Sequence, residues 1–550
     1  MQAIQEGYDY VVVGGGTAGS VLAARLSESA ATVLLLEAGP LSPPPEVYDL
    51  RAFPSRLLGS PVDWSYRTVP QPGTAGAVHL WPRGKLLGGT SGINAMAHIR
   101  GHRKNFDAWA AAGAVGWSYE ELLPHFKRSE TAPRRDPAYR GMRGPLLVTP
   151  PRSEMPGAAA FRQAVVSNGH PVSDDINGRD QVGAFLFEMN LVVGRRQSAA
   201  DAYLRRIVAR PNLHLVGDAL VHRLLIQRGR CIAVEFSVGG ELRTVRVAHE
   251  AVLAAGVIGS AQQLLLAGIG PADELRPLGI KAAVDLPGVG KNLQDHIQSR
   301  VVYAAARPMR TAANGFCPVA AMLRSDFKTG VAPDVFLLLL DFPAPPMVAG
   351  TDFAASLPDA GYTISFSQQS PPASRGCVRL ATAAPDMPPL IDPAYYSSPA
   401  DLAAMIAHLR LARSVGEADS LRPWRLAEVA PGPRVQDDAE LADYLRRSSG
   451  SSFHPVGTCR IGHDPMAVVD SDLRVHGVEG LRVADASVMP DIVSANPNAT
   501  VVAIAERAAE RILASASSTT RRDAGPANVS RHEPYLSPCT GIRRIGQRRG

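Results

Sequence analysis

The clearest pattern of hydrophobic and polar positions lies in residues 8–40. Residues 8–13 form an apolar, β-branched run, which is typical of a strand buried on both faces. A helix is predicted over residues 17–27 and a second buried strand over residues 32–36. This order of strand, helix and strand predicts the start of an α/β domain.

A second block with a related pattern follows residue 212. Alternating residues predict a meander of strands, and a further apolar run at 248–256 leads into a helix over 259–266. The predicted strands cover residues 213–217, 219–227, 231–238 and 241–247. Since strands and helices again follow one another, two separate blocks are expected to build one α/β domain.

Residues 301–428 have a different character. β-like runs alternate there with proline clusters, which predicts an antiparallel sheet with long loops. Helices are predicted for 399–415, for 439–447 and for most of 496–513. The expected domain boundaries are 1–150, 196–300 and 441–514 for the α/β domain, 151–195 and 301–440 for a second domain, and 515–550 for a disordered tail.

Composition and charge narrow the classes of function. The 550 residues carry a formal charge of +6, but the stretch from Ser515 onward contributes +5, because it holds seven arginines and two acidic residues. No nucleic-acid-binding face is therefore expected on the folded body. Neither a membrane span nor a signal peptide is expected. The five scattered cysteines include no C-x-x-C pair, which argues against disulfides or zinc and favours a reducing, cytoplasmic compartment.

The first turn between strand and helix carries a dinucleotide-binding signature. Gly14, Gly16 and Gly19 form G-x-G-x-x-G. These glycines allow a tight turn, a close approach of pyrophosphate to the backbone, and close packing of helix on strand. Glu37 ends the second strand, where a carboxylate can accept hydrogen bonds from ribose hydroxyls. A glycine-rich turn without a ligand is the alternative, and the motif alone does not separate FAD from NAD.

A second glycine-rich segment, residues 84–100, reads GKLLGGTSGINAMAHIR. Consecutive free N–H groups in such a segment can form a nest that holds an anion. Asn94 follows, at what is expected to be a helix start. A flexible hinge loop is the alternative interpretation.

Seven ordered blocks together resemble the glucose–methanol–choline (GMC) family of flavin-dependent oxidoreductases. They are YDYVVVGGGTAGSVLAARL, GKLLGGTSGIN, AAGVIGSAQQLLLAGIG, PGVGKNLQDH, HPVGTCRIG, LRVADASVMP and NPNAT. The resemblance extends from Tyr8 to about Leu513. It implies a Rossmann-like α/β domain that binds FAD, joined to an α+β substrate domain with a mostly antiparallel sheet.

The resemblance also implies where FAD binds. The implied cofactor-binding positions are Gly14, Gly16, Thr17, Ala18, Gly19, Glu37, Gly89, Asn94, Met96, Val221, Asp485 and Ala486. In members with a covalent flavin, a histidine precedes the asparagine of the first signature. Ile93 stands there in this chain, so FAD is expected to bind without a covalent bond, although His98 lies near in sequence.

In the family, a histidine and a second histidine or asparagine face the flavin. The positions matched to them are His454 and Asn498. Oxidation of an alcohol by hydride transfer needs a base for the hydroxyl proton, and an imidazole suits this task near neutrality. An asparagine amide can hold the hydroxyl oxygen but takes no proton at this pH.

The expected activity is FAD-dependent oxidation of a primary alcohol to the aldehyde, with oxygen or a quinone as electron acceptor. The alternative is a lyase on the same fold, similar to a hydroxynitrile lyase, in which FAD takes no electrons. No metal site is expected, and neither H-E-x-x-H nor G-x-S-x-G occurs. No carboxylate in a readable motif marks a site for a quaternary ammonium, and the choice among alcohols stays open.

Overall fold

A seven-stranded sheet is built from three distant parts of the chain. Its strand order is β10-β2-β1-β13-β12-β11, with β24 beside β13. The strands are β1 (Gly7–Val13), β2 (Val33–Leu36), β10 (Leu213–Val216), β11 (Ala219–Gln227), β12 (Arg230–Val238), β13 (Glu241–Leu253) and β24 (Leu481–Val483). The pairs of β1 with β2 and β13, of β10 with β2 and of β13 with β24 are parallel, whereas β11, β12 and β13 form an antiparallel meander.

The strand β13 combines two predicted elements into one. Residues 241–247 and the apolar run at 248–256 were expected separately, but the strand continues to Leu253. Its first half pairs with β12, and its second half pairs with β1 and β24. The change from alternating to continuous hydrophobicity therefore marks a change of neighbours within one strand.

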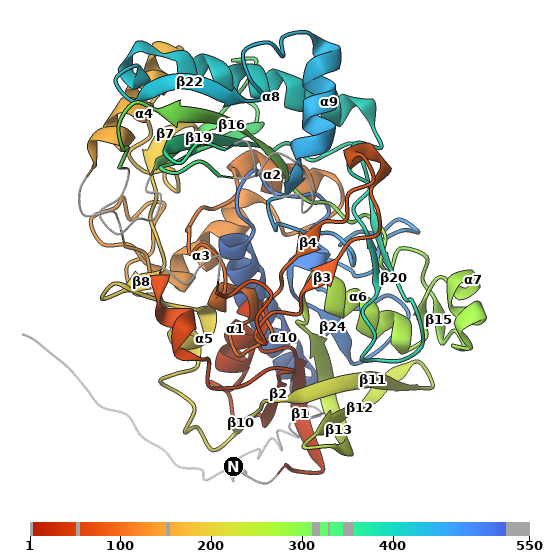
Figure 1. Ribbon diagram of the computed structural model, residues 1–550. Coiled ribbons are helices and arrows are strands. Elements are labelled where there is room, and N and C mark those ends of the chain that lie inside the picture. Colours follow the sequence, from red (N-terminus) through yellow and green to blue (C-terminus); the bar gives the residue numbers. More distant parts are fainter. Residues whose placement is uncertain are drawn as a thin grey trace, which may run out of the picture. The chain divides into compact units, whose positions relative to one another are not determined.

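Three helices follow strands of this sheet along the chain. They are α1 (Thr17–Leu26) after β1, α6 (Gly256–Leu266) after β13, and α10 (Asn498–Asp523) after β24. Figure 1 shows α1 and α10 near β1 and β2. The prediction of disorder from residue 515 is wrong for residues 515–523, which continue α10. No glycine or proline interrupts the sequence before Gly525 and Pro526, so nothing local stops the helix earlier.

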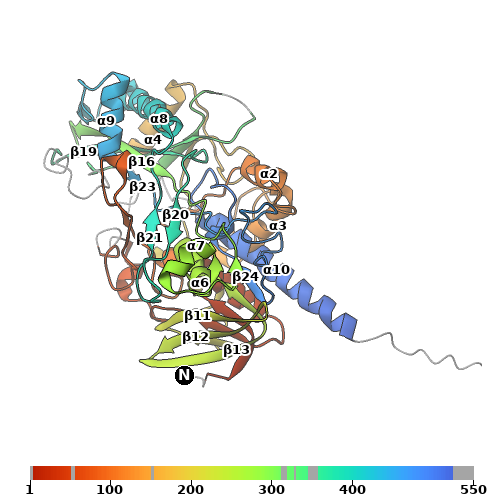
Figure 2. The ribbon, with the colours of Figure 1, turned by 90° about the vertical axis from the view of Figure 1, so that its right-hand side faces the viewer.

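A second large sheet is antiparallel throughout, with the order β22-β16-β19-β18-β17-β7 and β23 beside β16. Its strands are β7 (Gly183–Leu186), β16 (Ile297–Ala305), β17 (Val319–Leu323), β18 (Val335–Leu340), β19 (Gly361–Gln368), β22 (Arg425–Ala430) and β23 (Gly450–Ser451). Helix α8 (Pro399–Glu417) packs against β19 and β16, and α4 (Pro156–Ser167) packs against β17 and β7. Figures 1 and 2 show both helices beside this sheet.

The remaining elements are short or lie at the periphery. The helices are α2 (Arg103–Ala111), α3 (Tyr119–Ser129), α5 (Ala199–Tyr203), α7 (Ala272–Leu275) and α9 (Asp438–Ser448). The short strands are β3 (Tyr66–Arg67), β4 (Leu80–Trp81), β5 (Glu130–Thr131), β6 (Leu146–Leu147), β8 (Leu191–Val192), β9 (Arg195–Arg196), β14 (Ile269–Gly270), β15 (Val284–Asp285), β20 (Cys377–Arg379) and β21 (Leu390–Asp392). Ser118 and Ser198 form capping boxes with Glu121 and Asp201 at the starts of α3 and α5.

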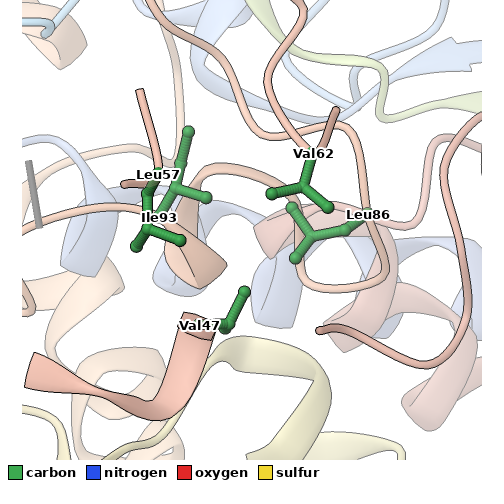
Figure 3. Packing of buried hydrophobic residues seen from close by; sticks show 5 residues of the cluster. All are labelled: Val47, Leu57, Val62, Leu86 and Ile93. Carbon is green, nitrogen blue, oxygen red and sulfur yellow. The ribbon is translucent and has the colours of Figure 1, made fainter. Parts of the chain in front are cut away.

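A small apolar cluster fixes the second glycine-rich segment. Its members are Val47, Leu57, Val62, Leu86 and Ile93, all at most 5% exposed. Figure 3 shows these side chains converging from separate loops. Because Leu86 and Ile93 flank the glycines at 88, 89 and 92, the cluster holds that segment in place.

The computed structural model describes residues 4–50, 56–149, 154–310, 319–327, 330–344 and 357–523, with side chains as far as residue 516. The chain divides into two units, residues 1–510 and 511–550, and both sheets belong to the first. None of the described helices combines the length and the hydropathy needed to cross a bilayer.

Candidate active site

A cavity of about 590 Å³ is lined by residues from both large sheets. Every residue predicted for the site lines it except Gly19, which lies behind the turn. These lining residues are Gly14, Gly16, Thr17, Ala18, Glu37, Gly89, Asn94, Met96, Val221, His454, Asp485, Ala486 and Asn498. The fold therefore brings together positions from the beginning, middle and end of the chain.

Close backbone packing requires glycine at positions 14 and 19 of the first turn. Gly14 has a φ of +99°, and a Cβ there would lie 2.7 Å from the carbonyl oxygen of Ala254. A Cβ on Gly19 would lie 1.8 Å from the carbonyl oxygen of Gly14, so α1 can approach the turn only without it. A Cβ on Gly89 would lie 2.6 Å from the Cα of Gly16. The two glycine-rich segments thus meet backbone to backbone.

Helix N-termini converge on this turn. The hydroxyl of Thr17, in the first turn of α1, donates to Oδ1 of Asn498, the first residue of α10, over 2.9 Å. Helix α6 begins nearby at Gly256, which also lines the cavity. Free N–H groups and the positive ends of helix dipoles favour a pyrophosphate in such a place.

Glu37 is buried at the edge of the cavity and fixed by the backbone. Its two carboxylate oxygens accept hydrogen bonds from the N–H groups of Gly15 and Gly39, over 2.8 and 2.9 Å. Burial raises the pKa of Glu37 to about 7, against the opposing effect of these hydrogen bonds. The carboxylate keeps further lone pairs for the hydroxyl groups of a ligand.

His454 lies on a segment anchored by a buried carboxylate. Its backbone N–H donates to Oδ1 of Asp295 over 2.8 Å, while Ser451 and Tyr395 both donate to Oδ2. The ring Nδ1 is 3.0 Å from Nδ1 of His296. Burial, with smaller effects of His296 and Arg83, holds the pKa of His454 well below its usual range. The imidazole is therefore neutral at neutral pH.

The other ring nitrogen of His454 contacts Asn496, which the sequence interpretation missed. Its Nδ2 lies 3.1 Å from Nε2 of His454. The predicted partner Asn498 is directed elsewhere, since its Oδ1 is engaged by Thr17 at the start of the helix. The resemblance matched Asn498 to the second flavin-facing position, but the structure brings Asn496 to His454 and Asn498 to Thr17. Both asparagines belong to the NPNAT block, which was the only signal available in the sequence.

Comparison with known proteins identifies the family of the chain. Family models described as GMC oxidoreductase match residues 8–298 and 372–505. The chain belongs to the GMC oxidoreductase family. It is 36% identical to an oxygen-dependent choline dehydrogenase of Brucella anthropi, over 96% of this chain and 98% of that protein. It is 37% identical to the mitochondrial choline dehydrogenase of Homo sapiens, over 92% of this chain and 89% of that protein.

Solved structures show the same fold. The crystal structure of pyridoxine 4-oxidase from Mesorbium loti superposes with a TM-score of 0.87 and 36% identity, over 92% of this chain and 98% of that one. A fungal aryl-alcohol oxidase superposes with a TM-score of 0.82 and 26% identity, over 94% of this chain and 100% of that one. This GMC protein is accordingly an FAD-dependent oxidoreductase that acts on alcohols. These relatives give no support to the lyase alternative.

The residues of the cavity fit FAD. The close approach of Gly16 and Gly89 leaves bare backbone that could hold a diphosphate, and the carboxylate of Glu37 could accept hydrogen bonds from the hydroxyl groups of a ribose. Asp485 has both oxygens engaged, Oδ2 by Gly256 and Ser260, and Oδ1 by Ser487. Its carboxylate thus fixes the start of α6.

Two further predicted positions are held by side chains within this GMC fold. The Oδ1 of Asn94 accepts from the backbone of Met96 and from Arg196. The carbonyl of Val221 accepts from Nε2 of Gln263. Both contacts orient backbone that lines the cavity.

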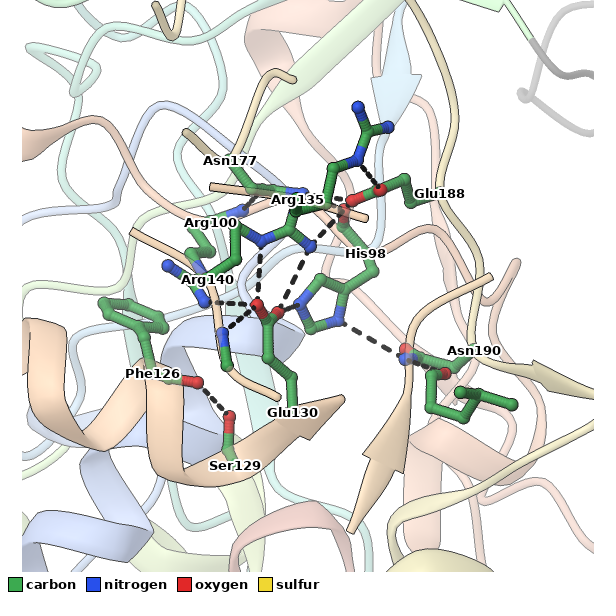
Figure 4. A network of polar contacts seen from close by, with 12 residues as sticks. His98, Arg100, Phe126, Ser129, Glu130, Arg135, Arg140, Asn177, Glu188 and Asn190 are labelled. Atoms are coloured by element: carbon green, nitrogen blue, oxygen red, sulfur yellow. Dashed lines mark hydrogen bonds and ion pairs between the residues drawn. The ribbon is translucent and has the colours of Figure 1, made fainter. Parts of the chain in front are cut away.

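His98 belongs to a buried ionic network next to the cavity. Its Nε2 is 2.9 Å from Oε2 of Glu130, and its Nδ1 is 3.3 Å from Nδ2 of Asn190. Arg100 and Arg140 also pair with Glu130, each over 2.7 Å. Figure 4 shows Glu130 in the middle of these groups. Both ring nitrogens of His98 are therefore occupied.

Proposed function

We propose that the enzyme oxidises a primary alcohol to the aldehyde, with His454 as the base and Asn496 as the group that holds the hydroxyl oxygen. The observation that carries this proposal is the contact between Nε2 of His454 and Nδ2 of Asn496 inside the cavity. A substrate hydroxyl within reach of both groups could give its proton to the imidazole and accept a hydrogen bond from the amide.

The hydrogen bond between His296 and His454 is compatible with transfer of the hydroxyl proton from the substrate to His454. A contact between two Nδ1 atoms at 3.0 Å requires one of them to carry the hydrogen. If His454 carries it, then Nε2 of His454 is unprotonated and can accept a proton from the substrate. His296 then accepts at Nδ1, and it fixes both the tautomer and the orientation of His454.

FAD, when bound, takes the hydride from the carbon that bears the hydroxyl. The protein must hold that carbon in a fixed place while the hydroxyl proton leaves. Asp295 serves this purpose, since it anchors the backbone of His454 and binds Ser451 and Tyr395 at the same time. Its own pKa is raised by burial.

We further propose that FAD is bound without a covalent bond. Ile93 stands where members with a covalent flavin have a histidine, and His98 is held by Glu130 and Asn190. Denaturation with acid should release all of the flavin into the supernatant. Flavin retained by the precipitated chain would contradict this proposal.

Oxygen is the acceptor that we propose, because oxidases and an oxygen-dependent dehydrogenase are among the relatives. Oxygen consumption should accompany turnover, and a requirement for added quinone would contradict it. A cytoplasmic location is proposed from the cysteines alone, since Cys231, Cys377 and Cys459 are free thiols. Fractionation of the source cells tests this location.

The experiment that tests the reaction compares three alanine variants under anaerobic conditions. When an alcohol that the wild type oxidises is added, His454→Ala should bleach its flavin about 10²- to 10⁴-fold more slowly than the wild type, at unchanged flavin content. Asn496→Ala should also slow bleaching, whereas Asn498→Ala should mainly lower flavin content, because it loosens the junction of α1 and α10.

Two outcomes would contradict the assignment. One is normal bleaching in His454→Ala, and the other is a slower reduction in Asn498→Ala than in Asn496→Ala. Because the pKa of His454 is well below its usual range, the rate of reduction in the wild type should also show no histidine titration between pH 6 and 8. Turnover of a cyanohydrin without bleaching would favour the lyase.

A further inference from the structure

The cavity has a second wall, which the glycine-rich motifs do not provide. It consists of one face of the antiparallel sheet. The residues of this wall are Gln298 and Arg300 on β16, Phe336, Leu338 and Leu340 on β18, and Ser365 and Ser367 on β19. Alternate residues of a strand share a face, and the register places Arg300, Ser365 and Leu338 in one row across the three strands.

Arg300 is a cation without a partner in this wall. Its Nε is buried and has no hydrogen-bond partner among the described residues, and none of their carboxylates pairs with it. Burial lowers the pKa of Arg300 only to about 10, so the guanidinium is charged at neutral pH. Leaving a buried charge unpaired is costly, unless a ligand of opposite charge binds there.

The neighbouring polar groups are engaged with one another. The Nε2 of Gln298 donates to the carbonyl of Ser451 over 2.8 Å, and its Oε1 accepts from Ser365 over 3.1 Å. The other guanidinium of the cavity, that of Arg83, donates to the carbonyl of Phe453 over 2.7 Å. Arg300 is thus the group in this wall that is left to receive a charged ligand.

The carboxylates of the cavity lie away from this wall. Among the described residues they are Glu37, Asp386 and Asp485. Glu37 accepts a hydrogen bond from the backbone N–H of Gly15, and Asp485 accepts one from the backbone N–H of Gly256. We call the glycine-rich turns that these carboxylates fix the cofactor cradle. Asp386 is exposed and precedes Met387, whose carbonyl accepts from Gln262 of α6. A quaternary ammonium at the sheet would therefore meet a guanidinium and no carboxylate.

We propose that the substrate is an alcohol that carries a carboxylate at the end remote from its hydroxyl, and that this carboxylate pairs with Arg300. The inference rests on the proposed function, since it takes the reacting hydroxyl to lie at His454. A guanidinium matches a carboxylate with two parallel hydrogen bonds, which fixes orientation as well as charge. Arg300 would thereby distinguish this enzyme from those that act on choline.

The wall and the site of the hydroxyl suggest the form of the substrate. Arg300 lies on β16 (Ile297–Ala305), which begins directly after His296. His296 in turn contacts His454. Phe336 and Leu338 present apolar surface beside Arg300. These features fit a hydroxymethyl group and a carboxylate at opposite ends of one aromatic ring.

The test uses the FAD-loaded full chain and four alcohols: 4-(hydroxymethyl)benzoate, its methyl ester, benzyl alcohol and choline. The readout is the rate of anaerobic flavin bleaching at low substrate concentration. The wild type should reduce its flavin at least tenfold faster with the carboxylate than with the ester, and slowest with choline. Arg300→Met should abolish the preference for the carboxylate and leave the rate with the ester within about threefold.

Matched variants separate charge from structure. Arg300→Lys should keep part of the preference, because it retains the charge without the two parallel donors. Arg422→Met removes an arginine that is 77% exposed and does not line the cavity, and it should behave as the wild type. A preference for choline or the ester in the wild type, or an unchanged preference in Arg300→Met, would overturn the inference.

A binding measurement keeps this test independent of the reaction. Terephthalate has carboxylates but no hydroxyl, and it should perturb the flavin spectrum of the wild type at concentrations at least tenfold lower than in Arg300→Met. If none of the four alcohols bleaches the flavin, the proposed function fails, while terephthalate still decides the role of Arg300. Equal binding of terephthalate to both proteins would refute that role.

Discussion

Replacing Glu37 by glutamine should change how the stability of the FAD-free protein depends on pH. Burial raises the pKa of Glu37 to about 7 from an ordinary value of 4.5. The folded state therefore binds this proton more tightly than the unfolded state. By linkage, the free energy of unfolding is greatest below about pH 4.5 and falls as the pH rises through 7.

The magnitude follows from the difference of 2.5 pKa units between 7 and 4.5. At 1.36 kcal/mol per unit, ionisation of Glu37 costs the folded protein about 3 kcal/mol, of which about 2.5 kcal/mol falls between pH 5 and pH 8. Glutamine carries no titrating proton, so Glu37→Gln should lack this loss. Its amide nitrogen will face a backbone N–H, which costs about 1–3 kcal/mol at every pH.

The assay is denaturant unfolding of FAD-free protein at several values from pH 5 to pH 8. The wild type should lose about 2.5 kcal/mol more over this range than Glu37→Gln, although the variant starts less stable. Glu479→Gln, at a side chain that is 82% exposed, serves as the control and should follow the wild type. Parallel pH dependence in wild type and Glu37→Gln would refute the reasoning.

The ionisation of Glu37 should also make the affinity for FAD depend on pH. Ribose hydroxyls donate hydrogen bonds to the carboxylate, so FAD favours the ionised form of Glu37. The affinity of the wild type for FAD should therefore rise from pH 5 to pH 8, and that of Glu37→Gln should stay flat. A wild-type affinity that falls over this range would show that Glu37 does not meet the ribose.

Two further substitutions test the buried ion pairs of Glu130 and the packing of α1 at Gly19. Glu130→Gln leaves Arg100 without its buried carboxylate partner, while Arg140 keeps Asp175 and Glu188. It should lower the free energy of unfolding by about 3–5 kcal/mol, whereas the exposed Asp443→Asn should change it by less than about 1 kcal/mol. Equal effects in denaturant titrations would contradict this. Gly19→Ala places a Cβ 1.8 Å from a backbone oxygen and should yield protein with little flavin, and a full flavin content by absorbance would disprove the packing argument.

The cofactor cradle could be predicted from the sequence because its signals are local. The turn between β1 and α1 leaves no room for a Cβ at Gly14 and Gly19, and Glu37 follows directly after the next strand. Each of these requirements is met within thirty residues, so no knowledge of distant contacts is needed. The predicted bounds of β1, α1 and β2 accordingly agree with the structure to within one residue.

The partner of His454 could not be predicted in the same way. Asn496 and Asn498 stand two residues apart in one block, and both are asparagine. What separates them is the start of α10 at Asn498, which turns that side chain toward Thr17 and leaves Asn496 before the helix. The bounds of a helix are the part of a sequence-based prediction that is least certain, and here a shift of two residues exchanges the two roles.

The wall that faces the substrate is hidden from sequence analysis for a stronger reason. Arg300, Ser365 and Leu338 are neighbours only through the register of three strands that lie far apart in the chain. The motifs shared with GMC relatives specify backbone that binds a constant cofactor, whereas this wall consists of side chains that each member can change without disturbing the cradle. Identity of 36% with a choline dehydrogenase along nearly the whole chain therefore shows the family. It does not carry over the alcohol, and the charge of Arg300 favours a different one.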